Sequence, residues 1–230
     1  MDDRTRFRVE TFYRADRDLI AQPLAEPRLL ANGRIFVPPI SPPYVNSVRG
    51  TARGVELFLE RRSANRLSGW LSYGWVKTRM RDSVTGATYP ADSEQRHTVT
   101  LFGSWRVSPS VHFSARYSYG SNYPIPGFLR WQNGQYYLSD HRNTLRLPAY
   151  HRLDFRINKS FHVETAGGWT WRGMLYAEVM NATNRRNTTF DAFNGFNSAT
   201  GQAYVSFLKL FPVVPAAGLM IEWERSLRGR

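Results

Sequence analysis

Polar and apolar side chains alternate with a period of two residues through much of this chain. In residues 52–62, Val55, Leu57 and Leu59 occupy one set of alternate positions, and Glu56 and Glu60 occupy the other. Successive side chains of a β-strand point to opposite faces of a sheet, so this period is typical of a strand with one apolar face. The alternation therefore predicts an all-β protein built from two-faced strands.

The same pattern predicts about eight strands, many close to the roughly 9 to 11 residues that a tilted strand needs to cross a bilayer. They cover residues 4–18, 52–62, 67–79, 97–107, 111–119, 151–162, 169–181 and 218–225. One face of several strands is rich in Arg, Glu, Asp, Ser and Asn, and the other in aliphatic and aromatic residues. A membrane barrel would turn the polar face to its lumen and the apolar face to lipid, whereas a soluble sheet would turn them to solvent and core.

Short and long connections alternate between these strands. Short turns are predicted near Asn65, Pro109 and Gly167. Residues 23–44, 81–94, 120–148 and 184–215 are rich in Pro, Gly, Asn or polar residues and are predicted to be mostly loop. Outer-membrane barrels have short periplasmic turns and longer extracellular loops, so this order favours a barrel over a soluble sandwich.

Aromatic residues mark the ends of the predicted strands. Amphipathic rings favour the headgroup level of a membrane, where one edge is apolar and the other is wet. The aromatic residues concerned are Tyr73, Trp75, Trp105, Tyr117, Tyr119, Trp169, Trp171 and Trp223.

Composition excludes several other classes of protein. No stretch reaches the roughly 18 consecutive apolar residues of a spanning helix, and a mean hydropathy of −0.47 is compatible with a membrane barrel. The chain has no cysteine, which excludes disulfides and thiolate chemistry. Its net charge of +13 comes from Arg residues spread along the chain rather than from a basic helix, so we predict no nucleic-acid partner.

No motif with the spacing of a catalytic, cofactor-binding or metal-binding site is found, so we predict no enzyme activity and assign no such residue. The five histidines lack the spacing of a metal pair: His97, His112, His141, His151 and His162. The pairs Glu56 with Glu60 and Asp154 with Arg156 share a face and are interpreted as lumen charges that pair across strands. Asn181 and Asn187 match the glycosylation pattern formally but are interpreted as strand-end and loop residues.

The long loop at residues 120–148 carries many aromatic residues. Two interpretations stay open for them, contact with a ligand at the outer surface and ordinary packing within the loop. These residues are Tyr123, Phe128, Trp131, Tyr136 and Tyr137. The sequence assigns no other substrate-binding residue.

Five segments, taken in order, resemble the last third of the barrel of TonB-dependent outer-membrane receptors. They are RGTARGVELFLERR (49–62), SGWLSYGWVKTR (68–79), EQRHTVTLFGSWRVS (94–108), LPAYHRLDFRINKSF (147–161) and LYAEVMNATNRRN (175–187). The last two are similar to the penultimate hairpin of these receptors. The resemblance extends from about residue 4 to residue 225.

The resemblance implies that residues 1–230 are the C-terminal portion of an antiparallel transmembrane barrel of roughly 22 strands in the outer membrane of a Gram-negative bacterium. The parent protein would import a scarce nutrient such as a metal chelate or a carbohydrate. Neither a plug domain, a TonB box nor a signal peptide is recognised here, so we expect these parts, and the contact with the TonB energy-coupling complex, in a longer parent. Outer-membrane lipid and lipopolysaccharide are expected partners, because basic residues attract phosphates.

Two alternatives stay open at this point. The chain could be a self-contained small outer-membrane barrel with a structural or adhesive role, since closure removes exposed strand edges. It could also be a soluble β-sandwich that binds a polyanion. A protein of the second kind would be soluble without detergent, and a barrel would not.

Overall fold

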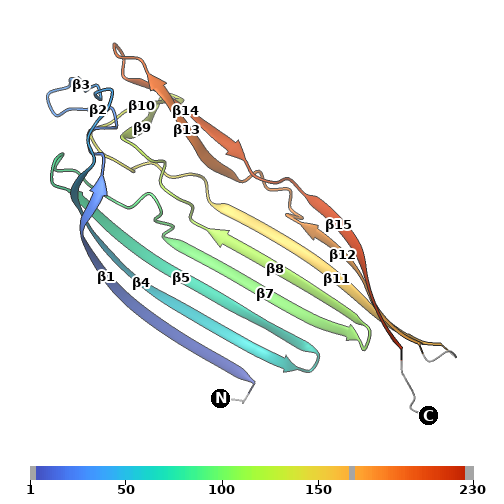
Figure 1. Ribbon diagram of the computed structural model, residues 1–230. Helices are drawn as coiled ribbons and strands as arrows, with labels where there is room; N and C mark the ends of the chain where they lie inside the picture. Colours follow the sequence, from blue (N-terminus) through green and yellow to red (C-terminus); the bar gives the residue numbers. More distant parts are fainter. Residues whose placement is uncertain (1–3, 166–168, 226–230) are drawn as a thin grey trace.

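Eight long antiparallel strands form one curved sheet in the computed structural model, which describes residues 4–165 and 169–225 (Figure 1). In pairing order they are β1 (Thr5–Ala21), β4 (Val45–Ala64), β5 (Leu67–Asp82), β7 (His97–Ser108), β8 (Val111–Gly120), β11 (Tyr150–Glu164), β12 (Trp169–Met180) and β15 (Val214–Arg225). The predicted all-β class and antiparallel sheet are confirmed. Within the residues described, no helix has the length and apolar content to span a membrane.

Several strands are longer than their alternation predicts. β4 begins at Val45 rather than at residue 52, and β5 continues to Asp82 rather than to residue 79. The added segments hold charged residues on both faces, so the backbone ladder continues where the apolar pattern has already ended. β1 also continues to Ala21, through a bulge in which Asp18 takes a left-handed φ of 55°.

The register of the long strands places odd-numbered residues on one face and even-numbered residues on the other, because nearly all paired positions have numbers that sum to an even value. An apolar row crosses six strands on the odd face: Phe7, Leu59, Leu71, Leu101, Tyr117 and Leu153. A neighbouring row on the even face is mostly polar: Arg8, Phe58, Ser72, Thr100, Ser118 and Arg152. The predicted division into two faces is therefore present in the sheet.

The odd face carries most of the exposed large apolar side chains of the long strands, including Phe7, Leu101, Trp105 and Trp223, which are each at least half exposed. The even face is covered at one end by loops. We call the odd face the outer face and the even face the inner face, because an apolar exposed surface suits lipid and a covered polar surface suits a lumen.

Aromatic residues gather at two levels of the outer face. Tyr73, Trp75 and Tyr117 lie toward the end with the long loops, and Trp171 and Trp223 lie at the opposite end with ring centroids 5.8 Å apart. Tyr73 and Trp75 were expected near the end of a strand, but β5 continues for seven residues beyond Trp75. The aromatic level therefore lies within the strand rather than at its end.

Short turns join strands at one end of the sheet (Figure 1). Asn65 and Arg66 turn the chain between β4 and β5 with φ of 52° and 69°, as the turn of a two-residue hairpin requires. Between β7 and β8, the Ser108 hydroxyl accepts a hydrogen bond from the Val111 amide at 3.1 Å. The turns predicted near Asn65 and Pro109 are confirmed, and the one near Gly167 lies outside the described residues.

The long connections hold more strand than the sequence predicts. The segments predicted to be loop contain β2 (Arg28–Leu29), β3 (Ile35–Phe36), β6 (Thr88–Tyr89), β9 (Leu129–Gln132), β10 (Gln135–Leu138), β13 (Thr188–Phe196) and β14 (Gln202–Lys209). β13, β14, β10 and β9 form a separate four-stranded sheet. The prediction of loop was wrong for 188–209 in particular, because register shifts after Phe190 and Phe193 interrupt the alternation.

The long-stranded sheet has two free edges, at β1 and at β15 (Figure 1). No pairing joins these two strands within the part of the chain that the structure describes. The arrangement therefore differs from a closed eight-stranded barrel. It also differs from a sandwich, because the long strands lie in one layer rather than in two.

Candidate functional site

The four connections at the long-loop end gather at that end of the sheet (Figure 1), and we call them the cap, because some of their residues lie against its inner face. Val48 and Asp82, paired on the inner face of β4 and β5, are buried beside cap residues such as Phe128 and Arg142. The cap also holds the apolar core of the molecule, in which the following residues are buried together: Ile125, Leu129, Leu138, Leu147 and Ala203. The long strands therefore place the cap at one end of the sheet, and the cap is stabilised by an apolar core formed from its own residues.

Arg142 joins two other connections of the cap. Its Nε and Nη2 donate hydrogen bonds to the two carboxylate oxygens of Glu26, at 2.7 and 2.8 Å, and its Nη1 and Nη2 donate to Asp92 at 2.5 and 3.1 Å. The guanidinium also lies 4.7 Å from the ring centre of Tyr89. Its side chain is 13% exposed, so three segments distant in the sequence are held by one nearly buried cation.

Electrostatics stabilise the charged forms in this cluster. Burial would lower the pKa of Arg142, but the hydrogen bonds and negative charges of Glu26 and Asp92 raise it above its ordinary value. Burial would likewise raise the pKa of Asp92, and hydrogen bonds from Arg142 and Asn143 hold it below its ordinary value. The side-chain Nδ2 of Asn143 donates to Asp92 at 2.6 Å and to the Pro90 carbonyl at 2.8 Å. Both shifts favour the charged forms of Arg142 and Asp92.

Glu94 forms a second buried junction, with 1% of its surface exposed. Its Oε2 accepts hydrogen bonds from the amide and hydroxyl of Thr78 at 2.6 and 2.8 Å, and its Oε1 accepts from Arg96 at 3.0 Å and from Arg146. Burial would raise the pKa of this carboxyl, but the Thr78 hydrogen bonds and the two arginines hold it below its ordinary value. This junction fixes the cap to β5.

A hollow of about 240 Å³ lies beneath the Arg142 cluster. Glu26, Asp82 and Arg142 supply its charged groups, and Tyr89 and Phe128 supply aromatic surface. Carboxylates, a guanidinium and ring faces in one concavity can hold a polar solute by hydrogen bonding and stacking. Within residues 4–165 and 169–225, no group of three or more His, Cys, Asp or Glu is arranged to hold a metal ion.

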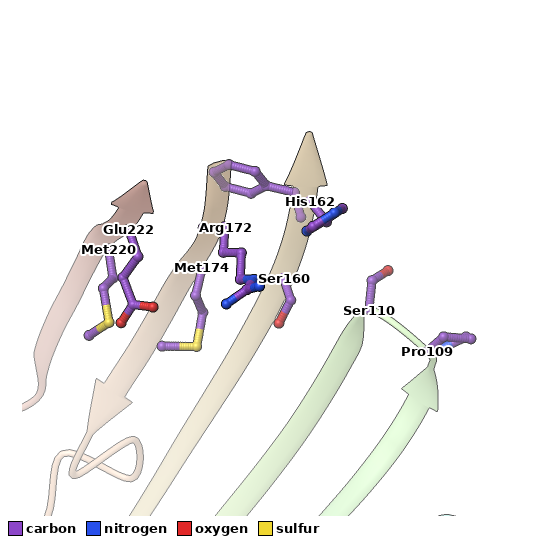
Figure 2. Close-up of a pocket in the computed structure, with 10 residues that line it drawn as sticks. Pro109, Ser110, Ser160, His162, Arg172, Met174, Met220 and Glu222 are labelled. Atoms are coloured by element: carbon purple, nitrogen blue, oxygen red, sulfur yellow. The ribbon is translucent and has the colours of Figure 1, made fainter. Parts of the chain in front are cut away.

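A larger concavity, about 560 Å³, lies at the short-turn end (Figure 2). Arg172 and Met174 project from β12 beside Met220 and Glu222 of β15. Arg172 faces Glu222 across the strand pair, and its Nη2 donates a hydrogen bond to Glu224 at 2.7 Å. This concavity belongs to the open inner face rather than to an enclosed site.

The histidines lie apart from one another in several structural settings. His97 and His151 lie on the outer face, where each Nδ1 is paired with a tyrosine hydroxyl, that of Tyr73 at 3.0 Å and that of Tyr117 at 2.9 Å. The others face different parts of the surface: His112 lies on the inner face, His141 contacts Asp140, and His162 contacts Glu164. The structure does not bring them together.

The predicted lumen charges lie on the inner face, as expected from their even numbers. Asp154 accepts hydrogen bonds from the Arg152 side chain and from the Asn181 backbone N–H, both at 2.8 Å. Arg156 donates to Glu178 of the neighbouring strand at 3.0 Å, so pairing across strands is confirmed for this residue. Glu56 instead lies opposite another acid, Glu10.

The two asparagines of the glycosylation pattern are buried. Asn181 donates hydrogen bonds to the carbonyls of Arg185 and Phe211, at 3.0 and 2.9 Å. Asn187 bonds both backbone groups of His151, at 2.7 and 3.0 Å. Their interpretation as strand-end and loop residues is confirmed, because both lie in the connection between Met180, where β12 ends, and Thr188, where β13 begins.

The loop aromatics divide between packing and exposure. Phe128 is buried in the cap, and Tyr136 packs between Trp131 and Phe207 with centroid distances of 4.6 and 5.8 Å. Trp131 and Tyr123 remain 54% and 44% exposed. Packing explains the first group, and the exposed rings keep a face toward solvent.

Sequence reasoning did not single out Glu26, Asp92, Glu94, Arg142 or Arg146. Their signal is weak, because charged residues in polar loops are usually solvated. The available hint was the density of prolines and asparagines around them, since an ordered loop needs internal partners for its polar groups.

A family model for the barrel of TonB-dependent receptor-like proteins matches residues 1–204. The match covers the first seven long strands and most of the cap. Searches of curated proteins and of solved structures find no match.

Proposed function

Because the chain belongs to the TonB-dependent receptor-like β-barrel family, whose members are transport proteins of the Gram-negative outer membrane, we propose that it supplies part of the wall and the extracellular loops of a receptor that imports a scarce nutrient. The observation that carries this proposal is the two-faced sheet with a cap at one end of its inner face. A solute that enters through the cap would meet the polar inner face and not the lipid.

The capped end is the extracellular end in this proposal. Outer-membrane barrels carry long loops outside and short turns on the periplasmic side, and the connections of this sheet divide in that way. The row of Phe7, Leu59 and Leu101 then lies at the level of the hydrocarbon.

The parent is proposed to have a larger barrel, with residues 1–230 as its C-terminal portion. Unpaired backbone groups at the free edges of β1 and β15 would be costly in lipid, so neighbouring strands are needed to cover them. A barrel of roughly 22 strands, filled by a plug that contacts TonB, meets this need. The stack of Phe58, Trp70 and Phe102 on the inner face, with centroid distances near 6 Å, supports a plug, because such rings gain more from a packed partner than from water.

The imported solute is proposed to be a metal chelate or a carbohydrate. Both classes present several oxygen atoms, which the charged groups of the hollow at Glu26, Asp82 and Arg142 can hydrogen-bond. Exposed rings such as Trp131 offer stacking surface at the entrance. Binding and passage need no catalytic residue, and none is proposed.

The location is tested by fractionating the source cells and probing each fraction with an antibody against residues 120–148. We expect the protein in the outer-membrane fraction, in a band several times heavier than 26.6 kDa. A soluble protein would contradict the proposal, and an outer-membrane band near 26.6 kDa would contradict the larger parent.

Transport is tested by deleting the gene and measuring uptake of labelled metal chelates and oligosaccharides. We expect saturable uptake of one compound to be lost, restored by the intact gene and abolished by a protonophore. Trp131→Ala should weaken uptake at limiting concentration, while Trp131→Phe keeps a ring and should retain it. Uptake that persists in de-energised cells would exclude energy coupling.

A further inference from the structure

Five cations gather on the outer face of β4 and β5, toward the capped end. We call Arg49, Arg53, Lys77, Arg79 and Arg81 the outer cation cluster. Arg53 pairs with Lys77 across the two strands, Arg49 pairs with Arg81, and Arg79 lies between these pairs. Directly opposed side chains of an antiparallel pair have Cβ atoms roughly 5 Å apart, so the five charges share one small area.

Within the part of the chain that the structure describes, no acid forms an ion pair with this cluster. All five side chains are exposed, and none makes an ion pair or side-chain hydrogen bond with another residue of the described parts of the chain. The acids of β1, β4 and β5 all have even numbers: Glu10, Asp16, Asp18, Glu56, Glu60 and Asp82. Asp18 lies in the β1 bulge, and the others lie on the inner face. Like charges opposed across strands repel, so the cluster favours an external anion.

The apolar band begins directly below the cluster. On β5, Trp75 and Tyr73 follow Lys77 toward the short-turn end, and Leu71 and Leu67 continue the apolar positions. Two residues of strand advance about 7 Å, so the ring of Trp75 lies one step below the ammonium of Lys77. A hollow of about 250 Å³ lies in the cluster itself, lined by Tyr13, Thr51, Arg53, Lys77, Thr78 and Arg79.

We propose that the outer cation cluster binds the phosphate groups of a phosphorylated acyl lipid of the outer leaflet, with the acyl chains lying on the apolar band below. Arginine forks match phosphate oxygens in pairs, and Thr51 and Tyr13 add hydroxyl donors at the same hollow. Nutrient is a poorer occupant, because the cluster lies on the opposite face from the capped hollow. The inference rests on the proposed outer-membrane location and assigns a specific site to the lipid partner that the basic composition predicts.

The test compares two triple variants of the whole protein, purified from outer membranes in mild detergent. R53Q/K77Q/R79Q removes three charges from the cluster. The control R6Q/R106Q/R116Q removes three exposed inner-face charges that have no ion pair among the described residues. The readout is phosphorylated lipid A retained per protein, followed by rebinding of lipid A from phosphatidylcholine vesicles.

Each cation near an anionic lipid surface contributes about a fivefold factor in affinity, so the cluster variant should bind roughly 100-fold more weakly. We expect the control and the conservative R53K/R79K to retain lipid, and dephosphorylated lipid A to bind weakly. The proposal would be overturned if the cluster variant retained as much lipid A as the wild type, or if the control lost as much as the cluster variant. Displacement of lipid A by equimolar inorganic phosphate would also overturn it. Absence of the protein from outer membranes would instead refute the location on which it rests.

Discussion

Replacement of Arg142 by Ala should loosen the cap while leaving the long strands intact. The substitution removes four hydrogen bonds to Glu26 and Asp92 and the contact with Tyr89. Removing one partner of a buried ion pair costs about 3 to 5 kcal/mol. Here the side chains of Glu26 and Asp92 are 34% and 50% exposed and regain water, so we expect about 2 to 3 kcal/mol.

Amide hydrogen exchange of the folded protein measures this local opening. Two backbone amides report on the cap: that of Asn143 donates to the Gly127 carbonyl at 3.0 Å, and that of Glu94 donates to the Ala91 carbonyl at 3.0 Å. Their protection should fall roughly 30- to 150-fold, since each 1.4 kcal/mol is a factor of ten. Amides in the middle of β7, such as that of Leu101, should keep their protection.

Arg14→Ala provides the matched control, because Arg14 is 72% exposed and pairs only locally with Asp16 at 2.9 Å. An exposed pair contributes less than about 1 kcal/mol, so protection in the cap should not change. Arg142→Lys keeps the charge but loses the fork and should give an intermediate effect. A change below about threefold at Asn143 in Arg142→Ala, or the same change in Arg14→Ala, would refute the assigned role.

Three further predictions concern the cap and the sheet. The pKa values of Asp92 and Glu94 are lower in the folded protein than in the unfolded chain, where they lie near 4. The stability that these two carboxylates contribute is therefore present above the unfolded pKa and is lost as pH falls through the folded pKa. Protease cleavage of the cap should accordingly rise at pH 3 but not at pH 6. Leu101→Lys on the outer face should destabilise the protein in vesicles by about 2 to 4 kcal/mol in urea unfolding, and the inner-face Thr100→Lys by much less. Leu129→Ala, at a side chain 1% exposed, should cost the cap about 2 to 5 kcal/mol, seen as faster exchange there.

The faces of the long strands were predictable because alternation is a local property. The outer face of β4 is recognised from three nearby residues, Val55, Leu57 and Leu59. The short turn to β5 pairs odd-numbered residues with odd-numbered ones, so the same alternation identifies the outer face of the next strand. β13 and β14 were not predictable in this way. Their pairing shifts after Phe190 and again after Phe193, so no constant period is left to detect.

The Arg142 cluster was beyond sequence reasoning for a different reason. Glu26 is 116 residues away from Arg142, and Asp92 is 50 residues away. The three side chains meet because the strands bring the cap connections to one end of the sheet. Local sequence patterns do not predict contacts between segments so far apart, and the burial of Arg142 is seen only in the folded structure.

The outer cation cluster, in contrast, could have been found from the sequence, because its residues follow the alternation of β4 and β5. The net charge of the whole chain does not reveal it, because that total does not separate the two faces of a strand. A total of +13 suggests a polyanion partner of any kind. When the residues of β4 are assigned to faces by their alternation, Arg49 and Arg53 lie on the outer face, whereas both acids of the strand, Glu56 and Glu60, lie on the inner face. A nucleic-acid surface would also gather cations on one face, but it would gain nothing from an exposed apolar band beginning at Val55 directly beneath them. The order of cation, aromatic ring and aliphatic side chain along a strand matches the order of phosphate, interface and acyl chain along a lipid, and that correspondence selects the lipid among the possible anions.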